Sequence, residues 1–223
     1  MVALIARFIF LIATFATLSA LGVLPAHDFG GKTVAQLLEL LESTDGGVRE
    51  DAALFLGYRY RKPGAVINPP TYKEQHPELP LPPQIIPRLI EHLKSDPDHL
   101  VRLQAMRALH DLRYRTNTTS LVVTGLEDTN ALVRIWTCEA LIDISHEYSD
   151  PLPARVVPTL AQSLSVDTTE DPAWLAAYIA GHLGAAGKEL LPQLQALRSH
   201  KSAKVRQYAR EAITSIQKAK RAD

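Results

Sequence analysis

The sequence predicts an all-α fold, an α-solenoid of about five helical hairpins, and three observations support this prediction. Segments of one pattern open at residues 48, 101, 133, 173 and 205, so the unit is near 32 residues with insertions. Small side chains recur at a fixed place in these segments. Each segment also follows a second amphipathic stretch. A fixed period of this size is typical of helical repeat arrays.

The five recurring segments predict the second helix of each hairpin. They read "VREDAALFLG", "VRLQAMRALHDL", "VRIWTCEALIDI", "AWLAAYIAGHLG" and "VRQYAREAITSI". Positions 4, 7 and 8 residues after the opening residue are small or apolar, and these offsets share one face of an α-helix. Small residues on that face allow a neighbouring helix to approach closely. The residues four after the opening are Ala52, Ala105, Thr137, Ala177 and Ala209.

The stretches before these segments predict the first helices. They read "TVAQLLELLES", "QIIPRLIEHLKS", "TSLVVTGLED", "ARVVPTLAQSL" and "ELLPQLQALRSH". Three of them carry a proline at the same place, namely Pro87, Pro158 and Pro192. Proline is tolerated in the first helical turn and otherwise bends the helix. The sequence therefore indicates either a helix start or a kink near each proline.

The hairpin unit, the proline and the "D…VR..A..AL" pattern resemble HEAT repeats of the short type found in many bacterial proteins, over residues 33–218. The resemblance implies that a series of aspartates and arginines, here Asp96 with Arg102 and Asp128 with Arg134, forms pairs either within a repeat or between neighbouring repeats. Two departures leave this series incomplete, because Ala173-Trp174 replaces Val-Arg and His200 replaces Asp.

Glycines and prolines mark two further features of the repeat array. Gly181 and Gly184 lie in the fourth segment, where each costs a helix about 1 kcal/mol relative to alanine, so we expect close packing or a helix end there. The insertion 62–83 contains seven prolines and no apolar period. It is expected to be extended, as a packed surface loop, a partner-binding loop or a spacer.

The N-terminus predicts export. Arg7 precedes a charge-free apolar run over residues 8–26, so residues 1–26 form a signal peptide or a membrane anchor. Cleavage after Gly22 is plausible, and an uncleaved segment would tether the protein to the membrane. In both cases the repeat domain, residues 27–223, is expected to be periplasmic or extracytoplasmic.

Composition argues against several classes of partner. The basic residues (Lys plus Arg) and the acidic residues (Asp plus Glu) number 24 each, so the protein has no net charge that would attract nucleic acid. The single cysteine excludes an internal disulfide framework and a Cys-rich zinc site. A protein partner recognised by local surface is the remaining expectation.

The stretch "TCEALIDISHE", residues 137–147, contains the residue types of a catalytic site. Cys138 and His146 are eight residues apart, about 12 Å along a helix, which is too far for direct contact. Cys138 is therefore expected to be a structural, buried cysteine. Neither HExxH nor a phosphate-binding glycine loop occurs. We expect no catalytic residues, no metal and no cofactor.

Two enzyme families are built from HEAT-like repeats, so the alternative function is that of an enzyme or enzyme subunit. Deoxyhypusine hydroxylase holds two irons through His-Glu pairs near the start of successive second helices. The corresponding positions here are Arg49-Glu50, Arg102-Leu103, Arg134-Ile135 and Arg206-Gln207, so that ligand set is missing. Bilin lyases are the second family, but export and short length count against them.

The sequence thus favours an exported, non-catalytic HEAT-repeat scaffold or adaptor that binds another protein. Its second helices are expected to line a concave surface. The alternative is a HEAT-like enzyme or enzyme subunit of the hydroxylase or bilin-lyase type. Candidate protein-binding residues come from the variable columns of the second helices and are Arg107, Glu139, Tyr178 and Arg210.

Overall fold

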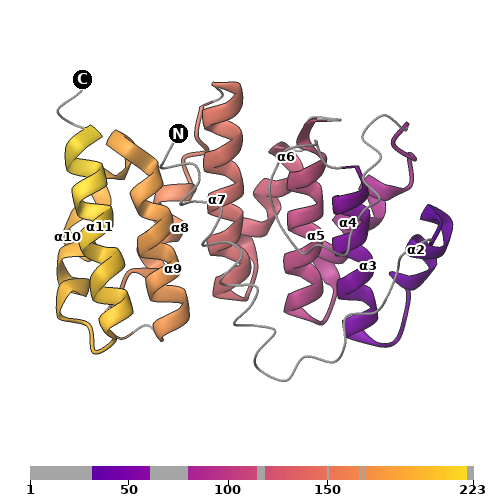
Figure 1. Ribbon diagram of the computed structural model, residues 1–223, viewed down its shortest axis with the longest axis horizontal. Coiled ribbons are helices and arrows are strands. Elements are labelled where there is room, and N and C mark those ends of the chain that lie inside the picture. Colours follow the sequence, from indigo (N-terminus) through magenta and orange to yellow (C-terminus); the bar gives the residue numbers. More distant parts are fainter. Residues whose placement is uncertain are drawn as a thin grey trace.

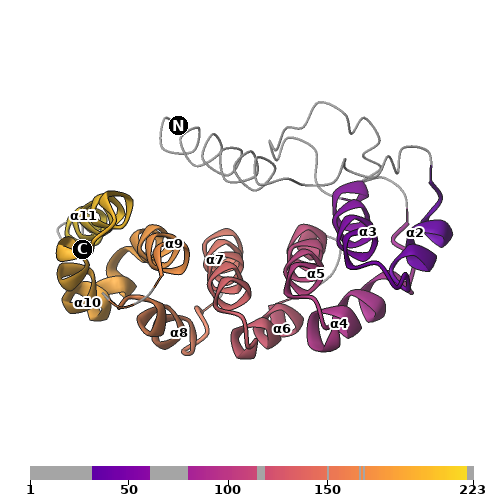
Figure 2. The same cartoon turned by 90° about the horizontal axis from the view of Figure 1, so that it is seen from below.

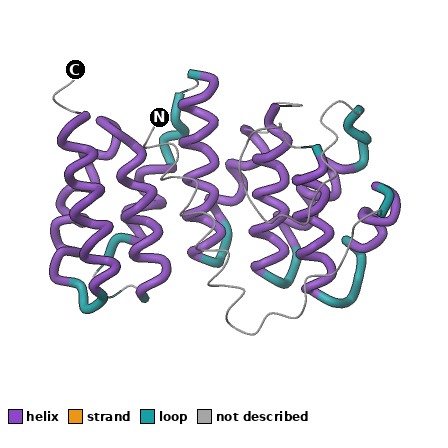
Figure 3. Tube along the Cα trace, viewed as in Figure 1, coloured by secondary structure: helices purple, strands orange, loops and turns teal. Residues whose placement is uncertain are grey.

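The computed structural model describes residues 32–60, 80–114, 119–149, 151–165, 167 and 169–219. The predicted signal or anchor segment 1–26 and most of the proline-rich insertion lie outside these residues. Within them every regular element is a helix, joined to the next by loops (Figure 3). The all-α prediction is confirmed for the described chain.

Five helical hairpins follow one another along this chain. Helix α2 (Val34–Leu40) pairs with α3 (Gly46–Arg59), α4 (Ile85–Ser95) with α5 (His99–Asp111), α6 (Thr119–Val122) and η2 (Val123–Glu127) with α7 (Ala131–Tyr148), α8 (Val156–Ser163) with α9 (Glu170–Ala180), and α10 (Leu191–Ala196) and η4 (Leu197–Ser199) with α11 (Ala203–Ala219). The 3₁₀ segments η1 (Leu112–Tyr114) and η3 (Gly181–Leu190) follow α5 and α9.

The hairpins stack side by side into a curved, two-layered array (Figure 1). Seen along the helices, α3, α5, α7, α9 and α11 form the inner, concave layer, and α2, α4, α6, α8 and α10 form the outer, convex layer (Figure 2). The second helix of each repeat therefore lines the concave surface, as the sequence pattern predicts.

The small residues found four positions after the start of each repeat segment, called here the small column, lie at the centre of the packing between helices. All five of its members are fully buried, and so are Leu56, Leu109 and Leu141 from the eighth position. Their burial on one face of the second helices confirms the face predicted from the offsets 4, 7 and 8. The members of the small column are Ala52, Ala105, Thr137, Ala177 and Ala209.

The three repeated prolines lie in the first turn of their helices. Pro87 and Pro158 are the third residues of α4 and α8, and Pro192 is the second residue of α10. A first-turn proline loses no helical hydrogen bond, because the first four N–H groups have no partner within the helix. Of the two alternatives, the helix start is correct.

Polar side chains start three of the second helices in the same way. Asp45, Asp98 and Asn130 are the N-caps of α3, α5 and α7, and each accepts a hydrogen bond from the backbone N–H two residues later, at 2.8–2.9 Å. Such caps satisfy N–H groups that the helix leaves without partners. Helix starts are thereby fixed at one register along the array.

Both explanations for the glycines of the fourth repeat are correct. Helix α9 ends at Ala180, and Gly184 has φ 55° and ψ −131°, a conformation that glycine adopts far more readily than other residues. A Cβ added at Gly181 would lie 3.2 Å from the Cα of Ala212 on α11. The chain thus ends one helix and packs tightly against the last one.

Candidate functional site

The concave surface is the candidate site, and helical geometry decides which columns face it. Position four is buried in every second helix, and position eight is buried in the first three repeats. Position six lies on the opposite side of the helix and therefore faces the concave surface. This column contains Leu54, Arg107, Glu139, Ile179 and Glu211, of which Ile179 is fully buried.

Two of the predicted binding residues, Arg107 and Glu139, belong to this concave column. Both are half-buried, on neighbouring helices α5 and α7. The guanidinium of Arg107 lies 5.5 Å from the ring centroid of Trp136 on α7, within the range of a cation–π contact. The stack holds a charged and an aromatic group together on the surface where a partner is expected.

Tyr178 and Arg210, the other two predicted binding residues, come from the fifth position, which lies on the flank toward the next repeat. Tyr178 packs edge-on against Tyr208 of α11, with ring centroids 5.8 Å apart, and against His182 at 4.5 Å. Arg210 is exposed on the last helix, beside a shallow hollow along α11. Tyr178 and Arg210 are thus not brought together with Arg107 and Glu139 in one column.

Bidentate ion pairs connect successive repeats near the loops that join the two helices of each hairpin. Arg49 donates from Nε and Nη2 to the carboxylate of Asp96 at 2.8 and 2.9 Å, and Arg102 donates likewise to Asp128 at 2.7 and 2.8 Å. Both pairs join one repeat to the next. The resemblance left open whether these residues pair within or between repeats, and the carboxylate pairs lie between them.

Within each repeat the arginine at this position also binds the backbone of its own loop. The Nη1 groups of Arg49, Arg102, Arg134 and Arg206 each donate to the carbonyl oxygen six residues earlier, at 2.7–2.9 Å. A guanidinium has enough donors for both tasks. One arginine therefore closes its own loop and, where the next repeat supplies an Asp, also binds that repeat.

The pairing direction explains why two departures from the pattern occur together. An arginine of repeat 4 would pair with an aspartate of repeat 5, and those positions are Trp174 and His200. A different contact joins these repeats, because the ammonium of Lys204 lies 3.6 Å from the ring centroid of Trp174. His200 keeps the loop role of the aspartate and accepts from the Ser202 N–H through Nδ1 at 3.1 Å.

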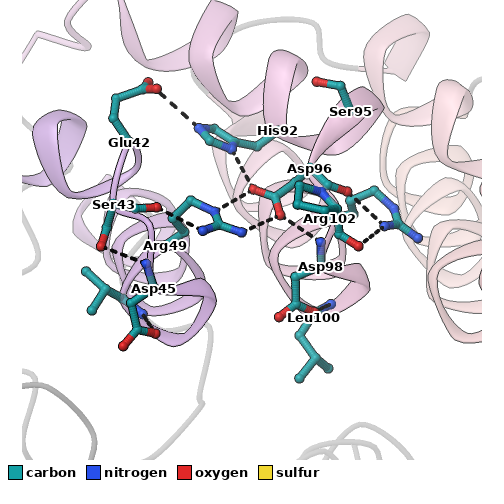
Figure 4. Close-up of polar contacts among 12 residues, drawn as sticks. Glu42, Ser43, Asp45, Arg49, His92, Ser95, Asp96, Asp98, Leu100 and Arg102 are labelled. Atoms are coloured by element: carbon teal, nitrogen blue, oxygen red, sulfur yellow. Dashed lines mark hydrogen bonds and ion pairs between the residues drawn. The ribbon is translucent and has the colours of Figure 1, made fainter.

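The first of these ion pairs includes a histidine (Figure 4). His92 Nδ1 lies 3.0 Å from Oδ2 of Asp96, and its Nε2 lies 4.0 Å from Glu42. Burial alone would raise the pKa of Asp96, but hydrogen bonds from Arg49, the Asp98 N–H and His92 hold that pKa below its usual value. The cluster resembles a catalytic His-Asp pair, yet Asp96 is already bound by Arg49, which gives the cluster a structural role.

A second polar pair lies between α3 and α5, and the sequence-based reasoning missed it. Gln104 Nε2 donates to Glu50 at 3.1 Å. Gln104 is only 5% exposed, and its Oε1 has no hydrogen-bond partner. These residues come from two different columns, so comparison within columns could not find the pair.

Cys138 is a buried cysteine, as expected from the sequence. Its side chain is fully buried, and its Sγ lies 3.7 Å from the carbonyl oxygen of Val156 in the next hairpin. Burial raises the pKa of the thiol to about 12. His146 is exposed near the end of α7, and Glu147 is ion-paired with Arg113 at 3.1 Å. The stretch "TCEALIDISHE" does not assemble a site.

Cys138 should therefore resist a thiol reagent while the protein is folded. At pH 8 the thiolate fraction of a group with pKa about 12 is on the order of 10⁻⁴, and burial blocks access as well. We expect dithionitrobenzoate to release no stoichiometric colour from native protein within an hour and one equivalent within minutes in 6 M guanidinium. Rapid reaction of the native protein would contradict the burial.

Among the described residues there is neither a metal-binding cluster nor a membrane-spanning helix. In residues 32–60, 80–114 and the later described stretches, no three His, Cys, Asp or Glu side chains are placed to hold a metal ion. No helix among these residues has the length and apolar character needed to cross a membrane.

The stacked hairpins and their concave face define a helical repeat protein of the α-solenoid class. Residues 86–178 match the family model described as HEAT repeats, which confirms the resemblance to HEAT-repeat proteins. No curated protein matches its sequence.

Solved structures agree with this fold. The complex of CpcE and CpcF of phycocyanin lyase from Nostoc sp. PCC7120 matches with a TM-score of 0.56 and 20% identity, over 89% of this chain and 70% of that one. A designed armadillo repeat protein matches at 0.51 and 17%, over 82% of each chain. A second designed armadillo repeat protein, in complex with the peptide (KR)4, matches at 0.51 and 16%, over 82% and 81%.

Proposed function

We propose that this protein is a non-catalytic scaffold that binds another protein along its concave surface. One observation carries the proposal. The buried fourth position of the second helices is small in all five repeats, whereas the concave sixth position changes from Leu54 to Arg107, Glu139 and Glu211 in the repeats where it is not buried. A uniform stacking face with a varied open face is what a repeat scaffold needs to recognise one partner.

Site-directed photo-cross-linking tests the proposal. A photoreactive benzoylphenylalanine replaces Arg107 or Glu139 on the concave surface, and Glu91 or Glu189 at exposed positions elsewhere. We expect one discrete heavier adduct from each concave position in native cells and none from the two control positions. The partner can then be identified from the adduct.

Two outcomes would contradict the scaffold. Adducts of equal yield from all four positions, or from none, would remove the concave surface as the binding site. Purified protein that takes up iron or a bilin in stoichiometric amounts would favour the alternative, a HEAT-like enzyme or enzyme subunit of the hydroxylase or bilin-lyase type.

We also propose that the repeat domain is exported and that its partner lies outside the cytoplasm. The apolar run of residues 8–26 after Arg7 supports this location. The same cross-linked sample distinguishes the two forms of the N-terminus, because cleavage leaves Val23 as the first residue and a membrane tether leaves Met1. Recovery of the adduct only with cytoplasmic proteins would contradict export.

A further inference from the structure

Helix α11 is the last helix of the described residues and forms one end of the array (Figure 2). In the earlier repeats, three positions of the second helix contact the repeat that follows. They lie one, five and eight residues after the opening residue, which is Val205 in α11. In α11 these positions are Arg206, Arg210 and Ile213, called here the end face.

Contacts inside the array show what each of these positions does. At the first position, Arg49 pairs with Asp96 of the next repeat. At the fifth position, Tyr178 packs edge-on against a tyrosine of α11. At the eighth position, Gly181 lies close against α11. The end face therefore consists of the same three positions that elsewhere bind a neighbouring repeat.

Arg206 is oriented like the arginines that bind a carboxylate. Its Nη1 donates to the carbonyl oxygens of His200 and Lys201 at 2.7 and 2.8 Å, as Nη1 of Arg102 donates to its own loop at 2.9 Å. In Arg102 the Nε and Nη2 groups also donate to Asp128 of the next repeat. Among the described residues no carboxylate pairs with Arg206, and its Nε and Nη2 keep access to solvent. Arg206 thus exposes the edge that binds a carboxylate in an earlier repeat.

The charge of the last hairpin favours a negatively charged occupant. Residues 181–218 contain seven Lys or Arg and two Asp or Glu residues, in a chain where the two classes are equal in number. Arg210 and Lys218 are exposed and line the shallow hollow along α11. Glu211 also lines it and accepts a hydrogen bond from Gln207. An anion that approaches α11 therefore meets an excess of positive charge.

An acidic protein fits the end face better than other anions. A guanidinium binds a carboxylate through two parallel N–H bonds, as in the pairs inside the array. Ile213 lies on the same side of α11 as Arg206 and is only half-buried. An apolar side chain beside the guanidinium favours a partner that offers apolar surface as well as carboxylates. Phosphate and nucleic acid offer mainly the charge.

We propose that the end face of α11 docks an acidic partner protein, whose Asp or Glu carboxylate is bound by Nε and Nη2 of Arg206. Arg210 adds a second positive charge, and Ile213 packs against the apolar part of the partner. The end face is distinct from the concave surface, so this inference does not rest on the scaffold function proposed above.

Fluorescence anisotropy with a labelled peptide of four Asp-Leu repeats tests the end face on the full chain. We expect binding that weakens with salt and that is absent when Asn replaces Asp in the peptide. Arg206→Lys keeps the charge but removes the two-pronged donor, so affinity should fall about tenfold or more. Arg210→Glu should abolish binding. Its matched control, Lys94→Glu, makes the same change of net charge at an exposed site on α4 and should leave affinity unchanged.

Thermal unfolding separates binding from folding. Because Arg210 is exposed, Arg210→Glu should unfold at the wild-type temperature while peptide binding is lost. Arg206→Lys also loses hydrogen bonds to its loop, so its affinity is measured where circular dichroism shows a folded protein. Equal affinity of wild type and both variants, or no binding of the peptide at low salt, would overturn the end face. Tighter binding of octathymidylate or of phosphatidylserine vesicles than of the Asp-Leu peptide would overturn it as well, since that result would indicate a general anion site.

Discussion

Replacing Asp96 with alanine is expected to destabilise the protein by about 3–5 kcal/mol, the range for removing one partner of a buried ion pair. The side chains of Asp96 and Arg49 are only 2% and 11% exposed. The variant would leave the Arg49 guanidinium without its carboxylate. It would also remove the acceptor of the Asp98 N–H and the partner of His92.

Urea denaturation of Asp96→Ala and of Glu91→Ala measures this effect. Glu91 is the matched control, because its carboxylate pairs at 3.2 Å with Arg88 on an exposed surface. Exposed pairs contribute about 0–1 kcal/mol, so the control should change little. Similar losses in the two variants would show that burial of the Arg49–Asp96 pair contributes nothing special.

The contribution of Asp96 should also depend on pH with a defined sign. Its folded pKa lies below the ordinary value of 3.8, so folding favours the ionised carboxylate. That stabilisation is complete above the unfolded pKa and disappears as the pH falls through the folded pKa. The stability difference between wild type and Asp96→Asn should therefore be constant near neutral pH and shrink below about pH 4.

Periodicity was sufficient to predict the helices and their packing face. Side chains at positions four and eight report burial directly, because a helix places them on one stripe whatever its neighbours are. Periodicity could not decide the direction of the Asp–Arg pairs. Asp96 is six residues from Arg102 in sequence, but stacking places its carboxylate beside Arg49 of the preceding repeat.

The candidate site could be predicted only in part for the same reason. Arg107 and Glu139 follow from a single column, whereas Glu50 and Gln104 become neighbours only when two helices are stacked. The fifth position, with Tyr178 and Arg210, varies as much as the sixth, and variation alone does not reveal which way a column faces. The spatial relation of adjacent repeats was the missing information.

Gly57→Ala is expected to be destabilising by about 1–3 kcal/mol, the usual cost of overpacking a tight core. The added methyl would lie 2.6 Å from the Cα and 2.8 Å from the Cβ of Ala108, so α3 and α5 would have to separate. In an open helix the same change would stabilise by about 1 kcal/mol through helix propensity. The sign of the measured effect therefore tests the close approach.

Gly125→Ala provides a matched comparison with a different obstacle. Its added methyl would collide mainly with the Thr137 hydroxyl, a side-chain atom, instead of backbone. Thr137→Ala should therefore relieve much of the loss in a double variant, with a coupling of about 0.5–3 kcal/mol. Ala108→Gly should not rescue Gly57→Ala, because the Cα of residue 108 remains in place.

Urea denaturation of both double-mutant cycles separates the two obstacles. Rescue at Gly125 but not at Gly57 would show that backbone contact limits the spacing of the first two repeats, and a side chain limits the spacing within the third. If both cycles were additive, the glycines would act through helix propensity alone. That result would remove close helix approach as the reason for glycine at these two positions.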